Sequence, residues 1–296
     1  MLFLTLAFVC SAILILLFKV FERNGIPVFQ AIVFNYCTAA TCGFIFLPDH
    51  HHVLSGEFIA QGWLPLSIFL GMMFITVFNL TSITTISYGV STASVASKLG
   101  LVFPVLFAFC LYNEGFNWIK LTGILAAFVA VILSSLKEKQ AGPVINKSKL
   151  HLLPYIVFIG SGACDSLTQF ANKRYLMNTG IEEFVMFIFV AAGVTGLTVF
   201  SFQLITGRTK LNPKSILGGI ALGIPNYLAY LFTLKALVNL SWGSSVIFPI
   251  INLGTVAFAT IAGFIAFKEK ISGINFIGLV FAAISIILIV LSNFHS

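Results

Sequence analysis

Apolar runs of about twenty residues recur along the chain, and glycine, proline, asparagine or charged residues bound each of them. A helix of this length crosses the roughly 30 Å hydrocarbon core of a bilayer, because each residue adds about 1.5 Å. The runs predict ten membrane-spanning helices, at residues 2–20, 28–47, 64–86, 90–112, 117–136, 152–173, 183–205, 215–236, 242–266 and 272–293. We therefore expect an all-α polytopic membrane protein.

The composition excludes a soluble globular protein. Only 8% of the residues are charged and 59% are hydrophobic, whereas soluble domains have roughly 25% charged residues. The net charge of +7 is interpreted as loop charge that faces anionic lipid rather than as a nucleic-acid surface. The five cysteines lie in apolar runs without the spacing of a disulfide framework or of zinc ligands. We expect a lipid bilayer around the chain, no nucleic-acid partner, no metal and no cofactor.

The two halves of the chain align with each other across one basic linker. Residues 137–151 contain four lysines and a Gly-Pro turn signal, and they separate five spans in residues 1–136 from five in residues 152–296. The positions that match at an offset of 155 residues include Gly25 with Gly180 and Glu114 with Glu269. A repeat of five spans inserts its second copy in the opposite direction, so the duplication predicts two inverted five-helix repeats.

The distribution of lysine and arginine predicts the orientation in a cell (inner) membrane. Basic residues accumulate in cytoplasmic loops. Most of those outside the spans follow odd-numbered spans: Lys19, Arg23, Lys137, Lys139, Lys147, Lys149, Arg208, Lys210, Lys214, Lys268 and Lys270. Both termini are therefore predicted to be non-cytoplasmic. The N-terminal run has no basic region before it and no cleavage motif, so we interpret it as a retained span rather than a signal peptide.

Two ionisable residues lie well inside predicted spans, where a charge costs about 2.5–3.5 kcal/mol on insertion scales. Lys98 lies in the run at residues 90–112, and Asp165 lies past the middle of the run at residues 152–173. Because such residues normally face a polar cavity or an opposite charge, we interpret both as substrate-binding residues. Pairing only with each other, or extension of the Lys98 ammonium to the membrane surface, is the structural alternative.

Uncharged polar residues complete the predicted substrate site. A polar stripe shares one helix face with Asp165 at steps of three and four residues: Ser161, Thr168, Gln169 and Asn172. Amide groups are costly to bury without a partner, so they predict a polar cavity. The predicted substrate-binding residues are Lys98, Asp165, Asn79, Gln169, Asn226, Tyr230 and Asn252. Gly100, Pro104 and Pro249 are expected to loosen or interrupt the helices near this site, as at the midplane of transporters.

These residues predict transport of a small polar metabolite, driven by a gradient or by exchange. The sequence has no hydrolase, zinc-protease or P-loop motif, and we expect no enzymatic activity. Lys98 would attract an anionic group, so an amino acid and a sugar derivative both fit. Asp165 either binds a coupling proton or neutralises Lys98 in the empty site. An intramembrane lipid-handling enzyme or flippase that uses the same cavity, and a receptor or scaffold, remain alternatives. The sequence does not indicate an oligomeric state.

Two matching segments give the chain a family resemblance. Each has a glutamate before a short polar turn and a glycine nine residues later, Glu114 with Gly123 and Glu269 with Gly278. With ten short spans in two halves, the chain resembles the EamA-type transporters of the drug/metabolite transporter superfamily. The resemblance implies an inverted-repeat bundle whose central cavity opens to one side at a time, and the movement of metabolites through it. It also implies that Lys98 and Asp165 lie on helices that line this cavity.

Overall fold

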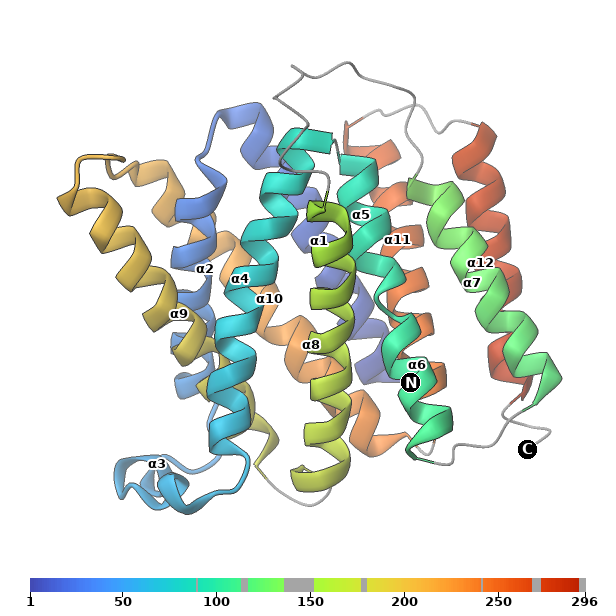
Figure 1. The fold of residues 1–296 in the computed structure, drawn as a ribbon, viewed down its shortest axis with the longest axis horizontal. Coiled ribbons are helices and arrows are strands. Elements are labelled where there is room, and N and C mark those ends of the chain that lie inside the picture. The colour runs from blue at the N-terminus through green and yellow to red at the C-terminus, as the bar shows by residue number, and fades with distance from the viewer. Residues whose placement is uncertain are drawn as a thin grey trace.

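The computed structural model describes residues 1–88, 90–112, 117–135, 152–176, 180–240, 242–267 and 273–292 (Figure 1). Helices and the loops between them make up these ranges, and no strand occurs within them. The prediction of an all-α fold is therefore confirmed for the described residues. The predicted linker at 137–151, together with Glu114 and Glu269, lies outside them.

The long helices run up and down between two ends of the bundle (Figure 1). They are α1 (Leu2–Asn24), α2 (Val28–Ile45), α4 (Leu64–Tyr88), α5 (Val90–Leu99), α6 (Val102–Cys110), α7 (Trp118–Ser135), α8 (Leu153–Tyr175), α9 (Ile181–Ile205), α10 (Pro213–Asn239), α11 (Ser244–Phe267) and α12 (Gly273–Ser292). Two short helices, α3 (His51–Leu54) and η1 (Glu57–Ala60), lie between α2 and α4.

Several helices are long and apolar enough to cross a bilayer. Within the described ranges these are six segments: α1, α2, residues 64–84 of α4, α9, α10 and residues 244–266 of α11. Three shorter apolar helical segments, Ala96–Cys110, Trp118–Leu133 and Phe276–Ser292, accompany them. The chain is therefore a multi-pass membrane protein.

The predicted span at 90–112 is divided into two helices, α5 and α6, by a break at Gly100 and Leu101. Pro104 has no N–H, so it cannot donate to the carbonyl of Gly100 one helical turn earlier. The Phe103 amide donates to the Gly100 carbonyl instead, at 3.0 Å, which closes a tighter turn. The expected interruption by Gly100 and Pro104 is therefore confirmed. Pro249, in contrast, lies inside α11, which continues past it.

Glycines bring several helix pairs into close contact. A Cβ on Gly71 of α4 would lie 2.7 Å from the Cβ of Ala191 in α9. A Cβ on Gly223 of α10 would lie 2.7 Å from the carbonyl oxygen of Asn35 in α2. Any side chain at these positions would collide with a neighbouring helix, so glycine sets how closely α4 approaches α9 and α10 approaches α2.

The helix contacts divide the bundle into a core and an outer pair. The core helix α1 packs on α10 and α11, and α8 packs on α4, α5 and α6. The helices α2 and α9 contact each other and also pack on α10 and α4, respectively. The helices α7 and α12 form the outer pair (Figure 1), where the Ser285 hydroxyl donates to the Gly123 carbonyl at 2.6 Å. The candidate site lies among the core helices.

Candidate functional site

The two intramembrane charges lie on neighbouring core helices. The Lys98 ammonium, in the last turn of α5, donates a hydrogen bond to the Asn252 Oδ1 of α11 at 3.0 Å. Asp165 lies on α8, which packs on α5. All three side chains are half-buried. The structure therefore brings Lys98 and Asn252 together, although 154 residues separate them, and places Asp165 on the helix packed against α5.

The break between α5 and α6 places Lys98 at a helix end inside the membrane. A helix C-terminus has carbonyl groups without intrahelical donors and carries partial negative charge, which favours a nearby cation. The α6 helix begins at Val102, four residues after Lys98, and its N-terminus carries the opposite partial charge. An ammonium and a helix N-terminus therefore lie close together in sequence at one level of the bundle.

Close packing between α5 and α8 holds the two charged helices against each other. A Cβ on Gly100 would lie 2.7 Å from the backbone nitrogen of Gly162. The backbone after α5 and the backbone of α8 are therefore in direct contact. The Ser161 hydroxyl, one turn before Asp165, donates to the hydroxyl of Ser97, which directly precedes Lys98, at 3.3 Å. Ser97 was not predicted as a site residue, because it stands at no recognisable spacing in the sequence.

A second group of polar side chains continues along α8 beyond Asp165. The hydroxyls of Thr168 and Tyr230 share a hydrogen bond of 2.9 Å between α8 and α10. The Gln169 amide donates to the Ser244 hydroxyl at the start of α11. The buried Gln169 Oε1 and Asn172 Oδ1 have no hydrogen-bond partner among the described residues. This stripe thus supplies buried acceptors that a bound solute or water can satisfy.

Aromatic rings surround this second group. Tyr230 makes edge contacts with Phe74 and Phe189, whose ring centroids lie 5.2 and 6.0 Å from its own. The Tyr36 ring also contacts Phe189, with the two ring centroids 6.0 Å apart. Tyr230 therefore has an apolar wall around its ring and a polar partner at its hydroxyl, as expected of a cavity-lining tyrosine.

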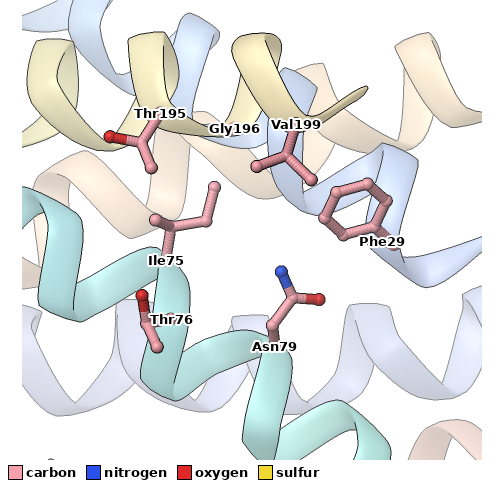
Figure 2. Close-up of a pocket in the computed structure, with 7 residues that line it drawn as sticks. All are labelled: Phe29, Ile75, Thr76, Asn79, Thr195, Gly196 and Val199. Carbon is pink, nitrogen blue, oxygen red and sulfur yellow. The ribbon is translucent and has the colours of Figure 1, made fainter. Parts of the chain in front are cut away.

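Two predicted site residues lie elsewhere. The Asn226 amide of α10 donates to the Asn35 Oδ1 of α2 at 3.2 Å, and so joins two helices that also meet at Gly223. Asn79 lines a pocket of about 80 Å³ between α4, α9 and the start of α2, where its carboxamide lies near Phe29 and Val199 (Figure 2). The structure therefore does not place Asn79 beside Lys98.

The site offers one cation, one carboxyl group and several neutral polar groups to a bound molecule. In the described part of the chain, no group of three or more His, Cys, Asp or Glu side chains is arranged to hold a metal ion. The charged pair can recognise an anionic group at Lys98 and a cation or a proton at Asp165. The hydroxyl and amide groups on α8 can orient an uncharged polar part of a solute.

The second half of the chain, residues 152–291, matches the model of the EamA-like transporter family. The resemblance to EamA-type transporters predicted from the sequence is thereby confirmed. The matched half includes Asp165, Gln169, Tyr230 and Asn252, and Lys98 of the first half donates a hydrogen bond to Asn252.

Two further likenesses cover nearly the whole chain. It is 29% identical over 282 residues to an uncharacterized protein of Haemophilus influenzae, and the match covers 94% of each chain. A solved structure described as the crystal structure of a protein matches with a TM-score of 0.75 at 16% identity. That match covers 98% of this chain and 96% of the other, so the two proteins share a fold over nearly their whole length.

Proposed function

We propose that the protein is a secondary transporter that moves a small metabolite with an anionic or zwitterionic group by alternating access. The observation that carries this proposal is the Lys98 ammonium inside the bundle, 3.0 Å from the Asn252 Oδ1, with Asp165 on the neighbouring helix α8. An intramembrane charge is costly and is normally retained for a substrate or ion path. The EamA-like match favours transport over lipid handling or a flippase.

An anionic group on the solute fits the surroundings of Lys98. The ammonium offers charge-assisted hydrogen bonds to a carboxylate or phosphate, and the N-terminus of α6 adds partial positive charge. In transporters, interrupted helices place such ends near the bilayer midplane. Gln169 and Tyr230 then contact the rest of the solute, and Asp165 holds the coupled proton or a cationic group of a zwitterion.

Helix packing supports the proposed inverted repeat of five plus five spans, in which α5 and α6 together form one span. The contacts of α1 with α10 and α11 correspond to the contacts of α8 with α4 and with α5 and α6. The α2–α10 contact corresponds in the same way to the α9–α4 contact. The first helices of the halves, α1 and α8, also run in opposite directions (Figure 1). Rocking of the two repeats around Lys98 and Asp165 would expose the site to each side of an inner membrane in turn.

A ligand-binding screen tests this function. Purified protein in detergent is heated with amino acids, nucleotide sugars, sugar phosphates and cationic drugs, and the unfolding temperature is recorded. A solute at 100 times its Kd adds about 2.7 kcal/mol of stability, which is readily detected. We expect an anionic or zwitterionic solute to stabilise the protein and Lys98→Met to abolish the effect. Lys214→Met, at the exposed start of α10, is the matched control.

Transport itself is then measured in proteoliposomes with the solute that the screen selects. A pH gradient is expected to drive its uptake, and Asp165→Asn is expected to remove this dependence on the gradient. Full transport by Lys98→Met, or stabilisation by solutes without any anionic group, would overturn the assigned role of Lys98.

A further inference from the structure

A cluster of charged and aromatic side chains joins three helices at the end of the bundle that carries Met1. The Lys235 ammonium of α10 lies 2.8 Å from the Glu182 Oε1 in the first turn of α9. The same ammonium lies over the ring of Phe3 in α1, 6.0 Å from its centroid. Phe3 in turn stacks on Phe232 of α10 at 6.0 Å. Lys235 therefore contacts both α1 and α9.

This cluster lies next to the candidate site along α10. Phe232 and Lys235 follow Tyr230 by two and five residues, and Tyr230 bonds to Thr168 of α8. Five residues of helix span about 7.5 Å, so Lys235 lies about one and a half turns beyond the site. The cluster thus stands between the site and this end of the bundle.

The form of α10 allows the part that carries the cluster to move on its own. Before the internal Pro225, Gly219 and Gly223 hold α10 tightly against α2. A proline inside a helix removes a backbone hydrogen bond and permits a bend at that point. Tyr230, Phe232 and Lys235 all follow the proline, so a change at Tyr230 can be passed to Lys235 without moving the anchored half.

The strength of the ion pair suits a contact that must open. Lys235 and Glu182 keep 28% and 22% of their side-chain surface exposed. Pairs that remain this accessible to water contribute little to stability, because solvent screens their attraction. A contact of this kind can hold one conformation without preventing the other from being populated.

We propose that Lys235, Glu182, Phe3 and Phe232 form a gate that closes the solute path at the end of the bundle carrying Met1. This inference rests on the proposed transport function and assigns the control of access to the same site. The gate opens when the half of α10 after Pro225 tilts away from α1 and α9, which separates Lys235 from Glu182 and Phe3 from Phe232.

A cysteine already present beside the site reports whether the gate is open. Cys164 precedes Asp165 and is buried, with 6% of its surface exposed. The reporter protein keeps Cys164 and carries alanine at the other cysteines: Cys10, Cys37, Cys42 and Cys110. It is reconstituted in liposomes, and a membrane-impermeant maleimide is added on the side that an N-terminal tag identifies as the Met1 end.

We expect Glu182→Gln and Lys235→Met each to raise the labelling rate of Cys164 about fivefold, the effect of about 1 kcal/mol on the opening equilibrium. Combining Phe3→Ala with either substitution should raise the labelling rate further. The matched control is Glu183→Gln, which removes the adjacent carboxylate in the same turn of α9 and should leave the rate unchanged. The exchanged pair Glu182→Lys with Lys235→Glu should restore slow labelling.

Any of four results would overturn the gate. The first three are unchanged labelling in the Glu182→Gln/Phe3→Ala variant, an equal rise in Glu183→Gln, and an equal rise with reagent on the opposite side. The fourth is failure of both Cys164 and a second reporter, a cysteine introduced by Ser161→Cys at a half-buried position, to label in every variant. Labelling requires no solute, so it separates the gate from the transport function. If the gate variants label faster but no solute flux is found, the gate is supported and the transport function is not. If solute flux is found but the gate variants label at the unchanged rate, the transport function is supported and the gate is not.

Discussion

The hydrogen bond between Lys98 and Asn252 can be tested by removing each partner and then both. Lys98→Met keeps an unbranched side chain and leaves the Asn252 carboxamide without its donor. Asn252→Leu keeps the branching and the number of side-chain heavy atoms, and leaves the ammonium without its acceptor. The double variant replaces a polar pair with two apolar side chains, so neither group is left unpaired.

The expected magnitude follows from the geometry of the bond. A hydrogen bond that involves a charged group contributes about 1.5–3 kcal/mol, and the donor–acceptor distance of 3.0 Å is ordinary for an N–H donor. Both side chains are half-buried, and water can replace part of the lost interaction, which places the expectation near 1.5 kcal/mol. Each single variant should lose about this free energy of unfolding, and the double variant should lose much less than the sum.

The assay is reversible unfolding in mixed micelles, in which the free energy of each variant is extrapolated to native conditions. A coupling free energy of about 1.5 kcal/mol is expected for Lys98 and Asn252. The control cycle combines Asn252→Leu with Lys214→Met, where Lys214 lies at the exposed start of α10 and should show additive effects. Additivity within about 0.5 kcal/mol for Lys98 and Asn252 would refute the assigned hydrogen bond.

Two further predictions concern the packing around the site. Gly71→Ala should lower the free energy of unfolding by about 1–3 kcal/mol, because its Cβ would overlap the Ile188 carbonyl oxygen, whereas Gly273→Ala, with nothing within 4 Å, should be nearly neutral in the same unfolding assay. Equal stability of the two variants would contradict the close α4–α9 contact. Gln30→Leu should speed backbone hydrogen exchange in the loop before α10. The buried Gln30 carboxamide accepts from the backbone N–H of Asn212 at 3.0 Å, and it donates to the Thr209 hydroxyl and the Lys210 carbonyl of that loop. Unchanged exchange in that loop would show that other contacts hold it.

The sequence predicted the helices well because a membrane imposes a local rule. Every backbone group in the hydrocarbon core needs an internal partner, so an apolar run of sufficient length becomes a helix wherever it occurs. The predicted run at 28–47 became α2 at Val28–Ile45, and the run at 183–205 became α9 at Ile181–Ile205. Where local signals competed, at Gly100 and Pro104, the predicted span became two helices.

The candidate site was predictable only in part. The cost of an intramembrane charge identified Lys98 and Asp165 without any knowledge of the fold. Ser97 and Ser244, which bond to Ser161 and Gln169, were missed, because serine is common in membrane helices and no spacing marks these two. Asn79, although polar and inside a span, lines a separate pocket.

The sequence by itself determined the membrane environment, the helices and the two costly charges, because each of these follows from residues that are close together along the chain. Only the tertiary structure decided that Lys98 bonds to Asn252, 154 residues away, and that Lys235 contacts both α1 and α9. Such pairings depend on the rotation of each helix about its axis and on how closely two helices approach. Glycine contacts between distant segments, such as Gly100 with Gly162, fix both quantities, and no local pattern encodes them.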